Sequence, residues 1–378
     1  MKINFSKIEQ RLAELNQYIF NNPELGYQEF KACQRHIDIF TELGFDCSIP
    51  YPDELPTAFK VEYGSGFPTV VFMSEYDALK DLGHACGHNL IATAAAKAFL
   101  ETANYLHENN IGGKIILLGT PAEENFGGKV DLINNGAFDG VDLALISHPH
   151  NYSCCSAGAV AVSRYDVIFE GKSAHASLDA EAGINALDAM ISFFNSVGLY
   201  RQQMDNSCQV HGIISQGGVA PNIIPDYTEA FFYLRADDDR KLTKLAERFA
   251  QMVQGAALAT GCKGIVHERK HPYTTEKINL PLKKLIRKYL ENKMVDFTEN
   301  ELKISSDYAN VSQIVPTANV FFNITKDDII PLHSTEFYEA AISEFAFEQA
   351  LKCGEILSEV AIEYFSDRQL QIDIKNNK

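Results

Sequence analysis

The segment from residue 74 to residue 90 gathers side chains that can bind metal ions. It reads SEYDALKDLGHACGHNL, so the acidic residues Glu75 and Asp77 precede Cys86 and His88. Thiolate, imidazole and carboxylate groups are the ligands that proteins offer to Zn²⁺ and related divalent ions. A single Cys-Gly-His sequence is weak support, because a free cysteine is commonly a small buried apolar residue. The segment therefore suggests a metal site that needs support from elsewhere in the chain.

Two further polar segments also follow apolar runs. The run 114–119 leads into Glu123 and Glu124, and the run 141–146 leads into His148. Apolar runs of this length are typical of buried strands in a parallel sheet. Because the carboxyl ends of parallel strands meet at one edge of the sheet, we expect these side chains to gather there. Three strands that each deliver polar groups to one edge favour a functional site over a structural one.

Size and composition limit the kinds of protein that this chain can be. Its 378 residues are enough for two domains, and its 46% of hydrophobic residues is ordinary for a globular protein. The net charge of −17 argues against nucleic acid or a membrane surface as a partner. The sequence shows neither a membrane-spanning apolar run nor the core of a signal peptide. The eight cysteines show no paired spacing, so we expect reduced thiols and a cytoplasmic protein.

Hydrophobic periodicity predicts the elements that position the polar segments. In the first part of the chain it indicates alternating helices and strands, as in an α/β domain. Helices are expected over 6–20, 28–43, 91–106 and 129–135, and strands over 59–63, 69–73, 114–119 and 141–146.

The pattern changes at about residue 160. Partly alternating strands and two amphipathic helices, over 184–197 and 241–260, follow in the order strand-helix-strand twice. This order predicts a small sheet with helices on one face. After residue 272 the earlier pattern returns. It indicates a helix over 280–290, a loop over 305–312, a strand over 317–324 and a final helix over 336–364.

The first domain is therefore interrupted by the second and then completed. We expect residues 1–162 and 273–378 to form one α/β domain, and residues 163–272 to form an inserted α+β domain.

Several segments carry a resemblance to a known family. In chain order they read NNPELGYQEFKA, SEYDAL, GHACGHNL, GTPAEENFGGK, GKSAHAS with GINALDA, APNIIPD, SSDYANVS and PLHSTEF. Their order and spacing resemble the M20 metallopeptidases, in particular the amidohydrolase and aminoacylase-like branch. That branch includes aminobenzoyl-glutamate hydrolase-like and β-alanyl-dipeptide hydrolase-like proteins. The resemblance covers roughly residues 17 to 345.

The resemblance implies a Zn-peptidase-like catalytic domain with an inserted ferredoxin-like lid, through which two chains form a homodimer. It also implies a pair of divalent ions, Zn²⁺ or Mn²⁺, with Co²⁺ or Ni²⁺ as further options. Glu123 falls on the position of the general base. His175, in the lid, falls on a residue that reaches the partner subunit's site and holds the oxyanion or the substrate carboxylate. The family's ligand positions correspond here to Cys86, His88, Glu124, His148 and His333.

The sequence departs from the family pattern at two places. Asn89 stands where many relatives carry an aspartate, which fits the dipeptide-hydrolase-like subgroup. Glu75 and Asp77 stand where classical M20 peptidases carry a His-x-Asp pair. This second departure fits the amidohydrolase branch, in which a cysteine and a histidine replace the usual ligands.

Further residues are expected around the centre. Asn222 and Arg235 are candidates for binding the substrate's carboxylate, since a guanidinium group binds carboxylates through two hydrogen bonds. Arg235 could equally lie on the surface of a lid strand. We expect Asp77 to orient a metal ligand, and Asp307 and Asn310 to line the pocket.

Glu123 and Glu124 cannot easily do the same work, because adjacent side chains point in different directions. We expect Glu124 to bind metal, and Glu123 to take a proton from water and pass it to the leaving amine. Without the other motifs, the pair would be interpreted as acidic residues at the start of a helix, favoured by its dipole.

These observations predict a metal-dependent amidohydrolase. Its substrate would be a small N-acyl amino acid or a dipeptide, attacked by metal-activated water with Glu123 as general base. A metallo-carboxypeptidase or dipeptidase is an alternative that differs only in the acyl half of the substrate. A non-catalytic binding protein of the same fold is a second alternative. The complete ligand set argues against it, as does Glu123, because a binding protein needs no base.

Overall fold

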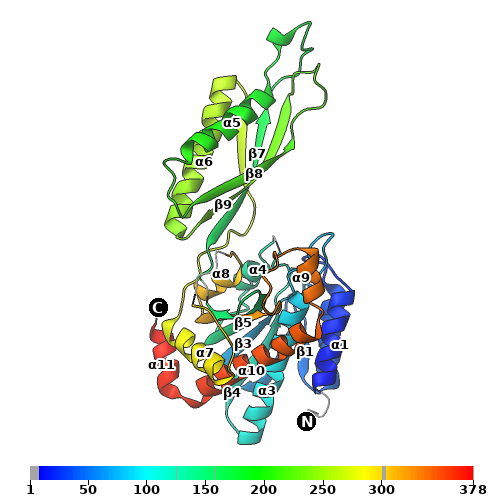
Figure 1. Cartoon of the computed structure of the whole chain (residues 1–378), viewed down its shortest axis with the longest axis vertical. Helices are drawn as coiled ribbons and strands as arrows, with labels where there is room; N and C mark the ends of the chain where they lie inside the picture. The colour runs from blue at the N-terminus through cyan, green and yellow to red at the C-terminus, as the bar shows by residue number, and fades with distance from the viewer. Residues whose placement is uncertain (1–7, 125, 157, 300–303, 378) are drawn as a thin grey trace. The chain divides into compact units, whose positions relative to one another are not determined.

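The structure is a computed structural model that describes residues 8–124, 126–156, 158–299 and 304–377. The chain divides into two compact units (Figure 1). Unit 1 comprises Met1–Gly158 and Glu276–Lys378, and unit 2 comprises Ala159–Thr275.

Unit 1 contains a seven-stranded sheet in the order β1-β2-β4-β3-β5-β11-β6. Its central strands β4, β3, β5 and β11 run parallel, and the outer strands pair antiparallel to their neighbours. All six residues of β3 are buried, as expected for a parallel strand covered on both faces. The strands are β1 Asp46–Ser48, β2 Lys60–Ser65, β3 Thr69–Ser74, β4 Gly113–Gly119, β5 Leu143–His150, β6 Cys154–Cys155 and β11 Thr317–Asn323.

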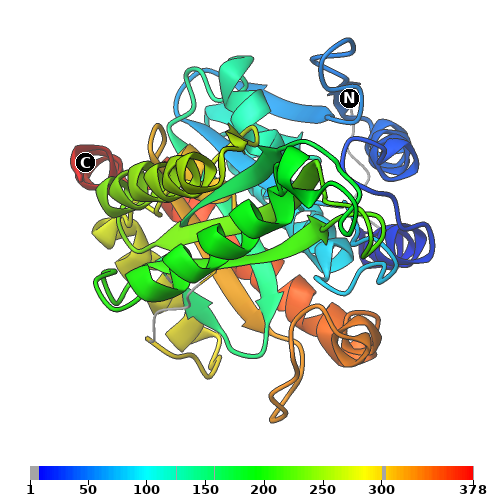
Figure 2. The same ribbon diagram turned by 90° about the horizontal axis from the view of Figure 1, so that it is seen from above.

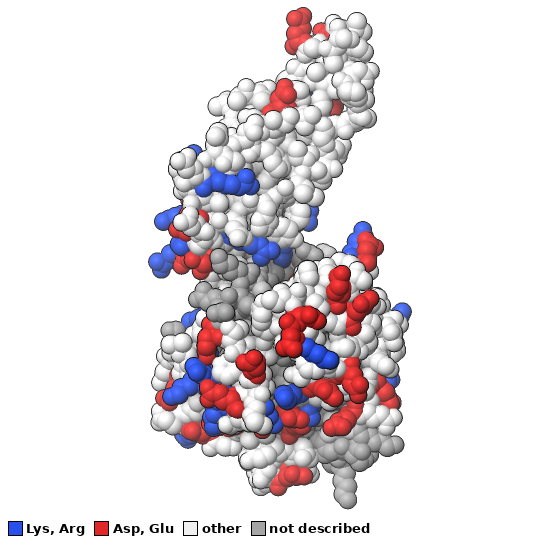
Figure 3. All heavy atoms as spheres, viewed as in Figure 1, with Lys and Arg blue, Asp and Glu red and all other residues white. Residues whose placement is uncertain are grey.

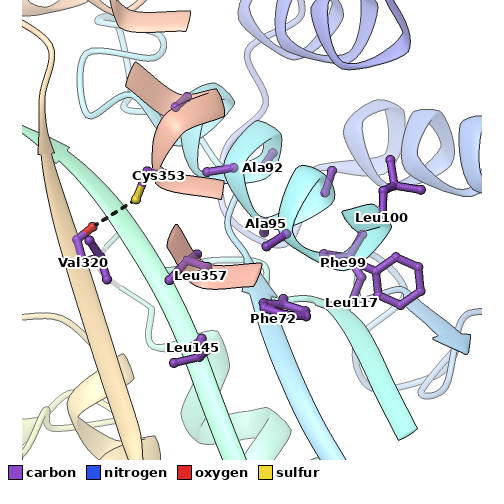
Figure 4. Packing of buried hydrophobic residues seen from close by; sticks show 14 of the residues in the cluster. Phe72, Ala92, Ala95, Phe99, Leu100, Leu117, Leu145, Val320, Cys353 and Leu357 are labelled. Atoms are coloured by element: carbon purple, nitrogen blue, oxygen red, sulfur yellow. Dashed lines mark hydrogen bonds between the residues drawn. The ribbon is translucent and has the colours of Figure 1, made fainter. Parts of the chain in front are cut away.

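Two long helices, α3 and α10, pack against each other and against this sheet (Figure 4). Ala92 and Ala95 of α3 present small side chains beside Phe72 of β3, so the helix lies close to the strands. A Cβ on Gly354 of α10 would lie 2.8 Å from the carbonyl oxygen of Ala94, so glycine permits this close approach. The helices of unit 1 are α1 Ile8–Asn21, α2 Phe30–Glu42, α3 His88–Asn109, α4 Gly128–Asn134, α7 Leu280–Asn292, α8 Tyr308–Ser312, α9 Thr335–Ala340, α10 Glu344–Ser366 and α11 Arg368–Asn376.

Unit 2 is an antiparallel four-stranded sheet in the order β10-β7-β9-β8, with α5 and α6 side by side on one face (Figures 1 and 2). Burial alternates along β9, because every second side chain faces the two helices. There Phe232 packs against Phe193 and Phe249. This arrangement confirms the ferredoxin-like fold. Its elements are β7 Ala161–Glu170, η1 Ala180–Ala182, α5 Ala186–Tyr200, β8 Gln209–Gln216, β9 Tyr227–Ala236, α6 Asp239–Thr260 and β10 Lys263–Glu268.

The C-terminal elements differ from the prediction. The helix expected over 336–364 is two helices, α9 and α10, because the Ser343 side chain accepts a hydrogen bond from Ala346 N at 3.1 Å and caps α10. The loop expected over 305–312 contains the short helix α8, and α11 was not predicted. The first residues of the helix expected over 6–20 lie outside the described residues.

Across the described residues, none of the helices combines the length and the apolar character that crossing a membrane requires.

Candidate metal centre

The parallel strands of unit 1 bring several polar segments to one edge of the sheet. Since β4, β3, β5 and β11 are neighbours with the same direction, the segments that follow them lie together. These segments carry Glu75 and Asp77 after β3, Glu123 and Glu124 after β4, His148 near the end of β5, and His333 after β11.

Cys86 and His88 reach the same edge at the start of α3. His88 is the first residue of the helix, and Gly87 before it has a φ of 76°. A Cβ on Gly87 would lie 2.5 Å from Cγ of Pro149, beside β5. Glycine is therefore required here both by the left-handed turn and by the close approach.

The side chains converge on one another. Cys86 Sγ lies 3.4 Å from Nε2 of His148. Oε1 of Glu124 lies 3.8 Å from Nε2 of His88 and 3.9 Å from Nε2 of His333. Three sets of possible ligand atoms lie within 4.8 Å of one another: Cys86 with His88 and His148, Cys86 with Glu124 and His333, and His88 with Glu123 and Glu124. The structure thus brings together all the predicted ligands and the predicted base.

Hydrogen bonds fix the orientation of two imidazoles. Nδ1 of His88 lies 2.9 Å from Oδ1 of Asp77, and Nδ1 of His148 lies 2.7 Å from the carbonyl oxygen of Pro149. When each Nδ1 carries the proton, each Nε2 has a lone pair directed at the cluster. The other oxygen of Asp77 accepts a hydrogen bond from Glu124 N at 2.8 Å. Asp77 thereby contacts two of the predicted ligands, as an orienting group would.

Three buried atoms of the cluster lack a hydrogen-bond partner among the described residues: Oε2 of Glu75, Nε2 of His88 and Oε1 of Glu124. Such atoms are costly to bury unless something satisfies them. Nε2 of His88 lies 3.5 Å from Oε2 of Glu75. Two atoms bound at about 2.1 Å to one tetrahedral ion lie about 3.4 Å apart. The donor atoms and their unsatisfied state therefore fit divalent cations.

Burial and like charges shift the pKa values of the cluster. Burial raises the pKa of Glu124 to about 7. It also raises the pKa of Glu123 well above its usual range, and the neighbouring charge of Glu124 adds to this. Burial raises the pKa of the Cys86 thiol as well, and it lowers the pKa of His148 to about 3. A bound divalent cation would oppose these shifts in the acidic groups by stabilising thiolate and carboxylate.

A buried ion triad lies beside the cluster. Nζ of Lys129 lies 2.6 Å from Oε1 of Glu75 and 2.6 Å from Oδ1 of Asp307. The three side chains are at most 1% exposed. Asp307 therefore supports Glu75 through Lys129, and the prediction that Asp307 lines an open pocket is wrong. Sequence reasoning missed Lys129, because a lysine at the start of a helix is usually exposed.

Two of the predicted substrate-site residues lie close together in unit 2. Ala176 N, next to His175, donates a hydrogen bond to the carbonyl oxygen of Asn222 at 2.9 Å. Nδ1 of His175 lies 3.2 Å from Oγ of Ser177. The loops that carry His175 and Asn222 thus form one end of unit 2.

Arg235 lies toward the other end of β9. Tyr227, at the first end of the strand, pairs with Glu170, just before the His175 loop, whereas Arg235 pairs with Val162. Eight residues of strand span about 26 Å. One protomer therefore cannot bring Asn222 and Arg235 to the same small carboxylate.

Comparison with known proteins assigns the family. Residues 161–260 match a peptidase dimerisation domain. A dinuclear metal binding peptidase of the M20 family from Bacillus subtilis shares the fold, with a TM-score of 0.65 and 17% identity over 92% of this chain and 98% of that one. The Xaa-Arg dipeptidase of Mus musculus is 36% identical over 94% of this chain and 85% of that protein. The chain belongs to the M20 peptidase family. The p-aminobenzoyl-glutamate hydrolase of Escherichia coli K12 includes a further relative, 29% identical over 66% of this M20 peptidase and 56% of the relative.

Family membership confirms the predicted class of reaction. As an M20 peptidase, the chain is a metal-dependent hydrolase that acts on amide bonds of small substrates. The predicted fold, an α/β catalytic domain with an inserted dimerisation domain, is confirmed by the same comparisons.

Proposed function

We propose that this M20 peptidase cleaves dipeptides with a centre of two divalent ions and with Glu123 as general base. The observation that carries the proposal is the convergence of thiol, imidazole and carboxyl groups at the carboxyl edge of the sheet, with three buried atoms left unsatisfied. The proposed ligands are Cys86, His88, Glu124, His148 and His333.

Cys86 is the proposed bridge between the two ions. It belongs to the set with His88 and His148 and also to the set with Glu124 and His333. A thiolate shared by two sets is suited to bind both ions, and Zn²⁺, Mn²⁺, Co²⁺ and Ni²⁺ are compatible with this mixture of ligands. Bound ions supply a water of lowered pKa and polarise the scissile carbonyl.

Glu123 is assigned the movement of the proton. Its carboxyl group lies in the set with His88 and Glu124, so it can reach a water between the ligands. Burial raises its pKa, which suits a group that takes a proton from water and passes it to the leaving amine. Glu124 is assigned to the metal, because it also approaches His333.

The substrate is proposed to carry a basic C-terminal residue. The mouse relative is named an Xaa-Arg dipeptidase. The net charge of −17 supports the same assignment, because an acidic protein attracts a cationic substrate. Acidic side chains are spread among fewer basic ones over the face of unit 1 seen in Figure 3. The relative named p-aminobenzoyl-glutamate hydrolase keeps N-acyl amino acids as the second candidate substrates.

A substrate panel tests this assignment. We expect kcat/KM to be at least about 10-fold higher for Ala-Arg and Ala-Lys than for Ala-Leu and Ala-Glu, from charge recognition of about 1.4 kcal/mol or more. Liquid chromatography of the released amino acids measures each rate, and N-acetyl-arginine distinguishes a dipeptidase from an acylase. Equal rates across the four dipeptides would contradict the preference for basic residues, and faster cleavage of N-acetyl-arginine would favour the second candidate.

Unit 2 is proposed to join two chains into a homodimer. β8 is an edge strand whose only partner in the sheet is β9. Seven of its eight residues are exposed, among them Ile213 at 66% and Ile214 at 42%. An exposed apolar edge strand is a ready surface for pairing with a second chain. The match to a peptidase dimerisation domain supports this assignment.

The protein is proposed to work in the cytoplasm. All eight cysteines are free thiols, as expected in a reducing compartment. Reducing conditions would also keep the Cys86 thiol available to bind metal.

A further inference from the structure

The segment from residue 21 to residue 32 belongs to the family resemblance, but the proposed chemistry gives it no role. It connects α1 to α2 and contacts two of the loops that carry the metal centre. The carbonyl oxygen of Glu24 accepts a hydrogen bond from Ala78 N at 2.8 Å, just after β3. The Tyr27 hydroxyl donates to Oδ2 of Asp131 in α4 at 2.5 Å.

The most direct contact is made by Glu29. Its side chain is fully buried, and its Oε1 accepts a hydrogen bond from Ala122 N at 2.8 Å. Ala122 immediately precedes Glu123 and has a φ of 60°. This left-handed conformation costs a residue with a Cβ about 1–2 kcal/mol. Surrounding contacts must hold Ala122 in it.

The packing leaves this turn little freedom. A Cβ on Gly26 would lie 3.1 Å from Cα of Ala122, and a Cβ on Gly128 would lie 1.9 Å from the carbonyl oxygen of Pro121. The carbonyl oxygen of Ala122 accepts hydrogen bonds from Gly127 N at 3.0 Å and Gly128 N at 3.1 Å. Both polar groups of the Ala122 backbone are therefore bound.

Glu123 consequently stands between two anchored amides. Ala122 N is bound to Glu29, and Glu124 N is bound to Oδ2 of Asp77. Each anchor is a buried carboxyl group from another segment of the chain. We infer, on the basis of the role proposed for Glu123, that Glu29 is a positioning residue that fixes the left-handed turn at Ala122 and so aims the catalytic carboxylate.

Matched substitutions test this inference. Glu29→Met fills the same space without an acceptor, whereas Glu29→Gln keeps a side-chain oxygen for Ala122 N. Burial raises the pKa of Glu29 to about 8, so glutamine resembles the neutral carboxyl group present at pH 7. Glu24→Ala is the control, because the Glu24 side chain caps α2 through Lys31 N and Ala32 N and its loss leaves the Ala122 amide untouched.

We expect Glu29→Met to lower kcat about 10- to 100-fold, with KM and the metal content within about twofold of the wild type, since small misplacements of a catalytic group cost this much. Glu29→Gln should restore kcat to within about threefold, and Glu24→Ala should keep the wild-type kcat. A wild-type kcat in Glu29→Met would overturn the inference. A loss of kcat in Glu24→Ala as large as that in Glu29→Met would overturn it as well.

Two further variants keep the test decisive. If Glu29→Met does not fold, Glu29→Asp replaces it, because the shorter side chain withdraws the acceptor by about one bond length. Equal kcat in Glu29→Asp and Glu29→Gln would then refute the role of Glu29. Glu123→Gln is measured in parallel. Wild-type turnover in Glu123→Gln would refute the proposed function itself, whereas an inactive Glu123→Gln beside a fully active Glu29→Met would refute the positioning role alone.

Discussion

At the scale of single residues, Asp77 has the most constrained environment in the centre. Its two oxygens accept from different donors, Nδ1 of His88 at 2.9 Å and Glu124 N at 2.8 Å. The charge of His88 outweighs the effect of burial and lowers the pKa of Asp77. A carboxylate is needed here, because an amide side chain offers only one acceptor atom.

Asp77→Asn should therefore weaken metal binding about 10- to 100-fold, the usual effect of removing a group that orients a ligand. Equilibrium dialysis against Co²⁺ measures the affinity directly, without relying on activity. Asp81→Asn is the control, because Asp81 is exposed in the same loop. Unchanged Co²⁺ affinity in Asp77→Asn would show that Asp77 does not orient the ligands.

The residue types of the centre could be predicted from the sequence, but their partners could not. Cys86 and His88 are recognisable because motif and strand end coincide. The Lys129 ion triad joins residues 54 and 178 positions apart, and no local pattern records such pairs. The contact between Glu29 and Ala122 spans 93 positions and was missed for the same reason.

At the scale of helices and strands, the long periodic elements agree with prediction and the short ones do not. α3 and β3 carry continuous apolar patterns, and the structure contains both. α8 has only five residues, and it follows Asp307, which binds both the side chain and the backbone of Lys129. A helix this short is set by its tertiary contacts more than by its own sequence.

α2 contributes a buried histidine whose titration should make stability depend on pH. Nδ1 of His36 lies 2.7 Å from the carbonyl oxygen of Ala32, and its ring stacks on Phe59 at 4.4 Å between centroids. Burial lowers the pKa of His36 from 6.5 to about 4. Between these values the unfolded chain binds a proton that the folded chain does not. The stabilisation is therefore complete above pH 6.5 and is lost as the pH falls toward 4.

We expect this histidine to cost the wild type about 2 kcal/mol of unfolding free energy between pH 7 and pH 5. His36→Gln should lose that much less over the same interval, although it is less stable at pH 7. Urea unfolding of chelator-treated protein at the two pH values measures the difference. His107→Gln, at an exposed position of α3, serves as control. Parallel losses in the wild type and His36→Gln would contradict the prediction.

At the scale of the whole molecule, the proposed dimer makes a prediction about His175. Family resemblance implies that this residue of unit 2 acts in the partner subunit's site. A mixed dimer of Glu123→Gln and His175→Ala chains would then contain one site with both residues intact. If each chain served its own site, the same dimer would have no intact site.

Refolding an equal mixture of the two inactive variants distinguishes these arrangements. Random assembly of a two-fold dimer should restore about a quarter of the wild-type activity, because half of the dimers regain one of two sites. Each variant refolded alone is the control. A mixture as inactive as its parents would show that His175 does not act across a dimer.

The central claim is that these residues form a two-ion centre in which Glu123 moves the proton. The most direct test is to load wild-type protein and Glu123→Gln with Mn²⁺ or Zn²⁺, and to measure ions per chain and hydrolysis of Ala-Arg on the same samples. We predict about two ions per chain in both proteins, and turnover reduced about 10²- to 10⁴-fold in Glu123→Gln. Two ions with undiminished turnover in Glu123→Gln would contradict the claim.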